Sequence, residues 1–203
     1  MNTAKTIQNY IQQIPLGKPF TIVSLRKFAS YVNTRQILSR LAKTGEITRL
    51  TRGVFVRPKE VAYLGKVLPE SKEIVEAVIQ ASGETIAVHG AEAARVLQLS
   101  TQVPMKPIFY TTGNTRYIKS GNREITLKHI SPRKLVKPGT TIGLVISALW
   151  YLGKNNVSMA VIEKIKQQLK VEEFSELLEY THQMPAWMAD MFYRYQAEHP
   201  DAR

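Results

Sequence analysis

Hydrophobic residues between positions 33 and 57 follow first a helical and then an extended spacing. Ile37, Leu38 and Leu41 fall on one face of a 3.6-residue period, which predicts a helix over residues 34–43. Cationic and neutral polar residues occupy the opposite face of this segment. The pattern therefore predicts an amphipathic helix with an apolar inner stripe and a basic outer one.

Polar residues and glycines mark the ends of this helix and the turn of the next segment. Asn33 or Thr34 can cap the start, because a short side-chain oxygen accepts a free N–H of the first turn, and Gly45 can end the helix. Hydrophobic and polar residues then alternate over residues 46–57, on both sides of a turn at 51–53, which predicts a β-hairpin. The residues expected to face the core are Ile47, Leu50, Val54 and Val56.

The preceding residues complete an order of elements that is typical of a winged helix–turn–helix domain. Residues 3–13 predict a first helix, residues 20–22 a short extended run, and residues 24–31 a second helix that Ser24 caps. With the amphipathic helix and the hairpin, the order is helix, strand, helix, helix, hairpin. We place this domain at residues 1–58.

The rest of the chain predicts a mixed α+β domain over residues 59–203. Residues 59–68 are interpreted as a connecting helical segment, and residues 71–82 as an amphipathic helix. A small antiparallel sheet is expected within about 85–130, because two Gly-Asn turns separate short β-like runs. Helices return over about 141–199. The predicted fold class is α+β, with an N-terminal winged helix–turn–helix domain.

Positive charge is concentrated in two segments of the chain. The net charge is +12, and residues 1–58 hold ten Lys or Arg against one acidic residue, Glu46. Residues 106–137 hold eight Lys or Arg against Glu124 alone, whereas the remaining segments are slightly acidic. Two basic segments in a near-neutral chain indicate a polyanionic partner. Neither segment is a long amphipathic helix with bulky apolar anchors, which is what a membrane surface would require.

The composition of the chain excludes several kinds of chemical site and a membrane-spanning helix. The chain has no cysteine, which excludes disulfides, thiolate zinc sites and cysteine nucleophiles. The N-terminus has no basic region followed by an apolar one, and the apolar run at residues 142–152 is too short to span a bilayer. We therefore expect a cytoplasmic protein with no membrane partner.

The exposed face of the predicted helix and the hairpin provide candidate DNA contacts. Arginine and glutamine can pair bidentately with guanine and adenine edges in the major groove, and a basic hairpin can reach flanking phosphates. Expected base readers are Arg35, Gln36, Ser39 and Arg40. Expected phosphate contacts are Lys43, Arg49, Arg52, Arg26 and Lys27, and the full candidate set also includes Thr34 and Arg57. The alternative interpretation is an ordinary solvated helix face.

The second basic segment offers secondary nucleic-acid contacts at Lys119, Arg123, Lys128, Arg133 and Lys134. Two interpretations remain open for these residues. They can extend a DNA footprint or bind RNA, or they can protect an exposed sheet edge from pairing with another chain.

The sequence contains few candidate catalytic or cofactor-binding residues. The four histidines lack metal-ligand spacing, and no P-loop, dinucleotide fingerprint or nucleophile elbow occurs. His89, which precedes Gly90, is the most suggestive, but we interpret it as a packed or turn histidine. The expectation is a protein that is not an enzyme and that has no metal site and no cofactor.

Three blocks of sequence resemble the AbiEi-type antitoxins, the transcriptional regulators of type IV toxin–antitoxin systems. The first includes Leu38-Ser39-Arg40-Leu41 and Arg52-Gly53-Val54-Phe55. The second extends from Gly90-Ala91-Glu92-Ala93-Ala94 to the string Leu99-Ser100-Thr101-Gln102-Val103-Pro104, and the third from Glu124-Ile125-Thr126-Leu127-Lys128 to Pro132-Arg133.

The resemblance implies a two-domain protein whose winged helix binds operator DNA and represses its own operon. It also implies antagonism of a nucleotidyltransferase-like toxin, with or without direct contact. The expected partners are double-stranded operator DNA and a cognate toxin protein, and the oligomeric state stays open. Two alternative hypotheses are a protein-interaction module that binds a toxin directly through the C-terminal helices, and an RNA-binding protein centred on residues 106–137.

Overall fold

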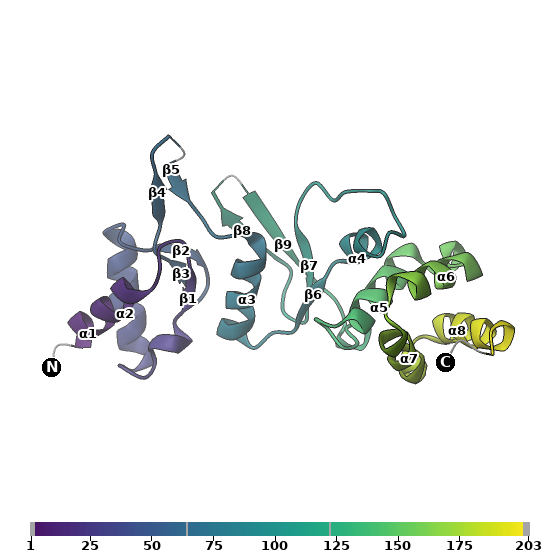
Figure 1. Cartoon of the computed structure of the whole chain (residues 1–203). Helices are drawn as coiled ribbons and strands as arrows, with labels where there is room; N and C mark the ends of the chain where they lie inside the picture. Colours follow the sequence, from purple (N-terminus) through teal and green to yellow (C-terminus); the bar gives the residue numbers. More distant parts are fainter. Residues whose placement is uncertain (1–2, 64, 122, 201–203) are drawn as a thin grey trace. The chain divides into compact units, whose positions relative to one another are not determined.

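The structure, a computed structural model, describes residues 3–63, 65–121 and 123–200 (Figure 1). Amphipathic helices and short strands form the α+β fold that the sequence predicts. Its sheets are small and antiparallel. The chain divides into two compact units, the first formed by residues 1–84 with 116–127 and the second by residues 85–115 with 128–203.

The first unit is built on the apolar stripe of the amphipathic helix predicted from the sequence. Its N-terminal elements are α1 (Thr3–Gln13), β1 (Pro19–Thr21), the 3-10 turn η1 (Val23–Leu25), α2 (Tyr31–Lys43), β2 (Thr48–Thr51) and β3 (Val54–Val56). The strands form an antiparallel sheet in the order β1-β3-β2. One core unites α1, α2 and this sheet, and its buried residues are Ile7, Ile11, Phe20, Ile22, Leu25, Leu38, Leu41, Ile47 and Phe55. This arrangement is compatible with a winged helix.

The predicted helix over residues 24–31 is wrong, and the helix predicted over 34–43 begins earlier. The Ser24 hydroxyl donates to Thr21 O at 2.7 Å, and the Ser24 N–H donates to Thr21 Oγ1, so this segment closes as a single 3-10 turn. Ser30 is the residue that caps α2, because its hydroxyl accepts the N–H of Asn33. Neither Asn33 nor Thr34 is therefore the cap, and α2 begins at Tyr31, three residues before the predicted helix.

The predicted helical segment at 59–68 is also wrong. It contains a hairpin of β4 (Lys59–Val61) and β5 (Gly65–Val67), paired antiparallel. Tyr63 and Gly65 both adopt positive φ angles, 71° and 68°. The left-handed conformation interrupts the right-handed helical backbone, and it closes the turn between these strands instead.

Further elements pack onto the first unit from later in the chain. Helix α3 (Ser71–Ser82) packs against β1 and β3, so β3 is buried on both faces. Gly83, at a φ of 69°, ends α3, whose bounds match the helix predicted over residues 71–82. The hairpin of β8 (Arg116–Ser120) and β9 (Arg123–His129) lies beside β2 and buries Ile118, Ile125 and Leu127. The compact unit thus extends past the domain boundary expected at residue 58, because α3 covers the open face of the sheet.

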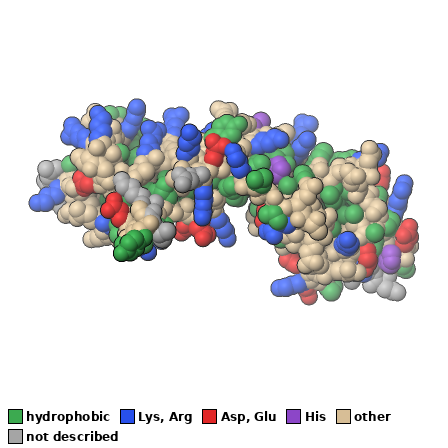
Figure 2. Space-filling view, turned by 90° about the horizontal axis from the view of Figure 1, so that it is seen from above, with side chains coloured by type: hydrophobic (Ala, Val, Ile, Leu, Met, Phe, Trp, Pro, Cys, Tyr) green, Lys and Arg blue, Asp and Glu red, His purple; other side chains and the backbone are tan. Residues whose placement is uncertain are grey.

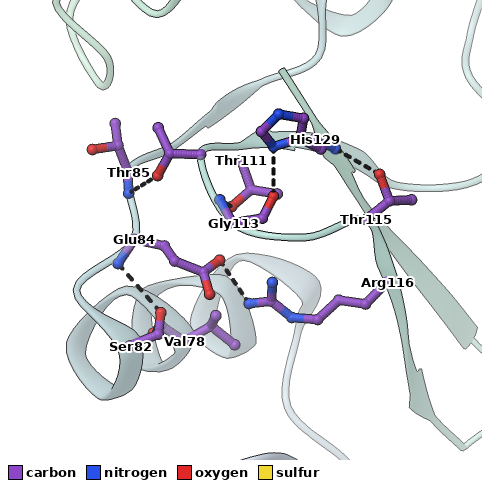
Figure 3. A network of polar contacts seen from close by, with 10 residues as sticks. Val78, Ser82, Glu84, Thr85, Thr111, Gly113, Thr115, Arg116 and His129 are labelled. Atoms are coloured by element: carbon purple, nitrogen blue, oxygen red, sulfur yellow. Dashed lines mark hydrogen bonds and ion pairs between the residues drawn. The ribbon is translucent and has the colours of Figure 1, made fainter. Parts of the chain in front are cut away.

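An ion pair anchors the start of β8 within this unit. Arg116 Nη2 donates to Glu84 Oε2 at 2.8 Å, directly after the end of α3 (Figure 3). The last residues of β9 belong to the second unit, where the His129 N–H donates to Thr115 Oγ1 at 2.9 Å. The loop before β8 is held there as well, since Gly113 O lies 2.8 Å from His129 Nδ1.

The second unit is organised around α5 (Thr141–Leu152), whose inner face is almost entirely apolar. The antiparallel pair β6 (Ile86–Val88) and β7 (Ile108–Thr111) and the helix α4 (Gly90–Val96) precede it. The later elements are η2 (Pro132–Lys134), η3 (Lys154–Asn156), α6 (Met159–Gln168), α7 (Val171–Glu179), η4 (Tyr180–Gln183) and α8 (Ala186–Glu198). In the described part of the chain, no helix has the length and apolar character needed to cross a membrane.

Gly90 allows α4 to pack closely on α5. A Cβ atom at this position would lie 2.5 Å from Ser147 O and 2.5 Å from Tyr151 Cβ. We predict that Gly90→Ala lowers the free energy of unfolding by about 1–3 kcal/mol, because the backbone of α5 has to move. Chemical denaturation measures this change. Val96→Ala, at an exposed position of α4, is the control and should change stability by less than about 0.5 kcal/mol.

Acid should destabilise the second unit through His89. Its Nδ1 accepts the N–H of Ala91 and caps α4, which requires an unprotonated nitrogen. Burial and the nearby Lys128 lower the pKa of His89. The unfolded chain therefore binds more protons once the pH falls below about 6.5, and stability decreases. Thermal unfolding between pH 7.5 and 5.5 should show a smaller decrease for His89→Asn, which keeps a capping acceptor. An equal decrease in both proteins would contradict this role.

Candidate nucleic-acid interface

Helix α2 separates its side chains into a buried and an exposed face. Thr34, Leu38 and Leu41 point into the core, and 3.6-residue periodicity then directs the remaining stripes to the surface. The predicted contact residues on this exposed surface are Arg35, Gln36, Ser39, Arg40 and Lys43. The exposed face is therefore a direct consequence of how the apolar stripe packs.

A groove of about 480 Å³ lies between α2 and the β2–β3 hairpin. Its buried apolar residues are Ile22 and Phe55, which belong to the core beneath it. The other described residues that line the groove are Tyr31, Arg35, Ser39, Ala42 and Lys43 from α2, and Arg49, Arg52 and Gly53 from the hairpin. The structure thus brings four of the predicted cationic residues, two from each wall, to one groove.

The hairpin wall of the groove is held in a defined position. Gly53 has a φ of 76°, which a glycine adopts without strain, and its carbonyl accepts the N–H of Ile22 at 2.9 Å. Arg49 Nε donates to Thr51 O at 3.3 Å, across the bulge between these two residues. These bonds fix the short turn on which Arg52 is exposed.

Electrostatically the groove is strongly positive, since no acidic residue is among the described residues that line it. Glu46 is the only acidic residue of the first 58 in the sequence. Its carboxylate accepts hydrogen bonds from Gln8 Nε2 at 2.8 Å and from the Thr44 hydroxyl at 3.1 Å. Figure 2 shows Lys and Arg side chains gathered over the N-terminal part of the chain, at the left of the view. Clustered cations of this kind attract polyanions.

Two of the predicted contact residues have structural roles instead. Thr34 is 0% exposed, and its hydroxyl donates to Ser30 O at 2.9 Å, so it is not available to a ligand. Arg57 Nη1 donates to Gln12 O at 2.6 Å and to Ile14 O at 2.7 Å, and it satisfies carbonyl groups at the end of α1. We therefore leave both residues out of the interface.

The remaining candidates of the first unit are exposed beside η1. Arg26 follows this turn directly, and both Arg26 and Lys27 are exposed. The Lys27 ammonium group lies 4.5 Å from the ring centre of Tyr10 and 5.0 Å from that of Phe28. These contacts hold the ammonium at the surface of the core.

The second basic segment is divided between the two units. Lys119 and Arg123 lie in the first, where Lys119 pairs in register with Glu124. Lys128, Arg133 and Lys134 lie in the second, where the Lys134 ammonium is 4.4 Å from the Trp150 ring centre. Lys137 in the same segment pairs with Glu176 and lies over Tyr180, and hydrogen bonds to these two residues raise its pKa. The positive charges of Lys134 and Lys137 therefore have partners within the protein.

The first turn of α2 contains surface residues that the sequence analysis missed. Tyr31 lines the groove, and Val32 and Asn33 are exposed beside it. The available signal was Ser30, a favourable cap directly before these residues. With the cap at Asn33 or Thr34, the predicted helix does not include the first turn of α2.

The described residues include no group of three or more His, Asp or Glu side chains that could hold a metal ion. A second cavity of about 250 Å³ lies within the second unit at the start of α5, where Thr140 caps the helix. Ala87, Val88 and Leu144 give it a largely apolar lining.

Comparison with known proteins identifies one family. The model of a family of unknown function, DUF6088, matches residues 6–177, from α1 to α7. No curated protein matches the chain significantly.

The two hydrogen bonds of Arg57 should matter for stability. We predict that Arg57→Met, which keeps the length of the side chain but removes its donors, lowers the free energy of unfolding by about 1–3 kcal/mol. The carbonyl groups of Gln12 and Ile14 lose a charged donor in this variant. Urea denaturation measures the change, and Arg40→Met on the exposed face of α2 is the control. Equal stability of the two variants would mean that the hydrogen bonds of Arg57 do not stabilise the fold.

Proposed function

The chain belongs to the DUF6088 family, whose function is unknown, and we propose from its own residues that it is a sequence-specific DNA-binding transcriptional regulator. Helix α2 enters the major groove of an operator, and the β2–β3 hairpin holds the adjacent sugar-phosphate backbone. The observation that supports this most strongly is the groove whose two walls carry Arg35 and Lys43 on one side and Arg49 and Arg52 on the other.

The dimensions of this groove suit a phosphate backbone. Arg35 and Lys43 are eight residues apart in α2, which corresponds to about 12 Å along the helix axis. Successive phosphates of one strand follow at about 3.4 Å of duplex axis, so cations spread over this length can neutralise several of them. A compact small anion would engage fewer of the four cationic side chains.

The exposed face of α2 suits the major groove. An α-helix with its side chains is about 10–12 Å wide, close to the width of the major groove of B-DNA. Gln36 and Arg40 project from the helix. The Gln36 amide offers the acceptor and donor that match the adenine edge, and the Arg40 guanidinium offers the two donors that match the guanine edge. Arg26 and Lys27, exposed at η1, contact flanking phosphates in this arrangement.

Repression of its own operon and antagonism of a nucleotidyltransferase-like toxin extend the proposal. What supports them is the resemblance to AbiEi-type antitoxins, at residues 38–55, 90–104 and 124–133. The first of these blocks contains the C-terminal part of α2 and most of the β2–β3 hairpin. The second begins with Gly90, where α4 packs on α5.

A mobility-shift comparison tests the proposal. The full chain is titrated against the DNA upstream of its own gene and against random duplex of equal length, at two salt concentrations. We expect a preference for the upstream fragment that survives the higher salt. Equal and salt-sensitive binding to both duplexes would mean that the protein is only a polycation. Tighter binding to single-stranded RNA than to duplex DNA would favour the RNA-binding alternative.

Single cations of the groove should contribute to affinity independently of sequence. Lys43→Gln or Arg52→Gln should weaken binding to specific and random duplexes by similar factors, because phosphates carry no sequence information. Each should also reduce the slope of log affinity against log salt by about one. Lys154→Gln in η3 removes the same charge from the second unit and should leave the slope unchanged. A slope that all three variants change equally would contradict the assignment.

A further inference from the structure

We infer that the outermost stripe of α2, formed by Val32, Gln36 and Arg40, is the base-reading surface, and that Val32 contacts the methyl group of a thymine. This inference rests on the proposed function, and it adds a residue and a base type to it. It also moves Arg35 and Ser39 from base reading to backbone contact.

The early start of α2 creates this stripe. Because Ser30 caps the helix, Val32 lies within the first turn and is 61% exposed. Val32, Gln36 and Arg40 occur at intervals of four residues, so they lie along one line of the helix surface. This line is opposite the buried face formed by Thr34, Leu38 and Leu41, and it therefore projects farthest from the core.

A second stripe of α2 faces the hairpin. Tyr31, Arg35 and Ser39 are also four residues apart, and all three line the groove. Val32, Gln36 and Arg40 are absent from the residues that line it, within the part of the chain that the structure describes. The helix thus presents one row of side chains to the groove and the neighbouring row outward.

The chemistry of the outer stripe matches three features of base edges. The thymine methyl group is the apolar feature that the major groove offers, and an aliphatic side chain such as Val32 can contact it. Gln36 can bind the N6 and N7 positions of adenine, and Arg40 the O6 and N7 positions of guanine. In helix–turn–helix proteins the N-terminal residues of the recognition helix contact base edges, which is where Val32 lies.

Helix geometry sets the spacing of these contacts. Four residues advance about 6 Å along α2, which is close to two base-pair steps of about 3.4 Å each. The expected operator therefore presents a thymine, an adenine and a guanine edge at intervals of about two base pairs. Asn33, exposed next to Val32, can add a second adenine contact on the same side.

The experiment begins with selection of binding sequences from a random duplex library by the full wild-type chain. Each thymine of the selected site is then replaced by deoxyuridine, which removes only the methyl group. We expect one position at which this replacement weakens wild-type binding by about fourfold, the effect of burying one methylene-sized group. Val32→Ala should bind the thymine and deoxyuridine versions equally.

A matched control separates this effect from the loss of any exposed valine. Val171 is 70% exposed in α7 of the second unit, and Val171→Ala should keep the wild-type difference between thymine and deoxyuridine. Because Val32 is exposed, its truncation should leave the thermal unfolding curve close to that of the wild type. That measurement is made on every variant before binding is compared.

The two arginines of α2 provide the second test. Selection with Arg40→Ala should lose the preference for guanine at one position, whereas Arg35→Ala should select the same sequence with lower affinity and a smaller salt slope. Loss of sequence preference in Arg35→Ala, with preference retained in Arg40→Ala, would overturn the assignment of the stripes.

The outcomes distinguish a failure at Val32 from a failure of the proposed function. If a sequence is enriched but deoxyuridine has no effect at any thymine, or the effect persists in Val32→Ala, the role of Val32 is wrong and the regulator remains supported. If the library yields no enriched sequence, the proposed function itself fails.

Discussion

The burial of one side of α2 is the constraint on which the rest of the first unit depends. Leu38 and Thr34 are completely buried, and they fix the rotation of the helix against α1 and the β1-β3-β2 sheet. Once this rotation is set, the periodicity of the helix places one polar row against the hairpin and another outward. Burial of Thr34, Leu38 and Leu41 thus determines where the cationic side chains of α2 lie.

The same constraint concentrates positive charge at the groove, where no acidic residue is among the described residues that line it. Arg35, Lys43, Arg49 and Arg52 come from segments that converge only because the hairpin packs on the core through Phe55. Like charges that line one groove repel one another, which disfavours the folded state slightly in the absence of a partner. A polyanion in the groove would remove this repulsion, and binding would then stabilise the fold.

Close backbone contacts between elements characterise the second unit. Gly90 brings α4 against the backbone of α5, and a Cβ at Gly143 would lie 2.3 Å from Lys137 O, so the start of α5 is packed equally closely. The basic residues nearby contact partners such as Trp150 and Glu176. Lys134 and Lys137 therefore contact groups of the protein itself, whereas Arg35, Lys43, Arg49 and Arg52 of the N-terminal segment line an open groove.

Sequence periodicity by itself determined the α+β class, the helix within α2, the β2–β3 hairpin and the core positions Leu38, Leu41 and Val54, because spacing along the chain fixes which residues share a face. It also identified the exposed cations, since charged side chains rarely remain buried. Only the tertiary structure decided that Thr34 is buried, that Arg57 binds the end of α1, and that residues 59–67 form a hairpin. The contacts of Arg57 depend on partners more than forty residues away, and the hairpin depends on left-handed backbone at Tyr63 and Gly65. No local pattern of hydrophobic and polar residues specifies either.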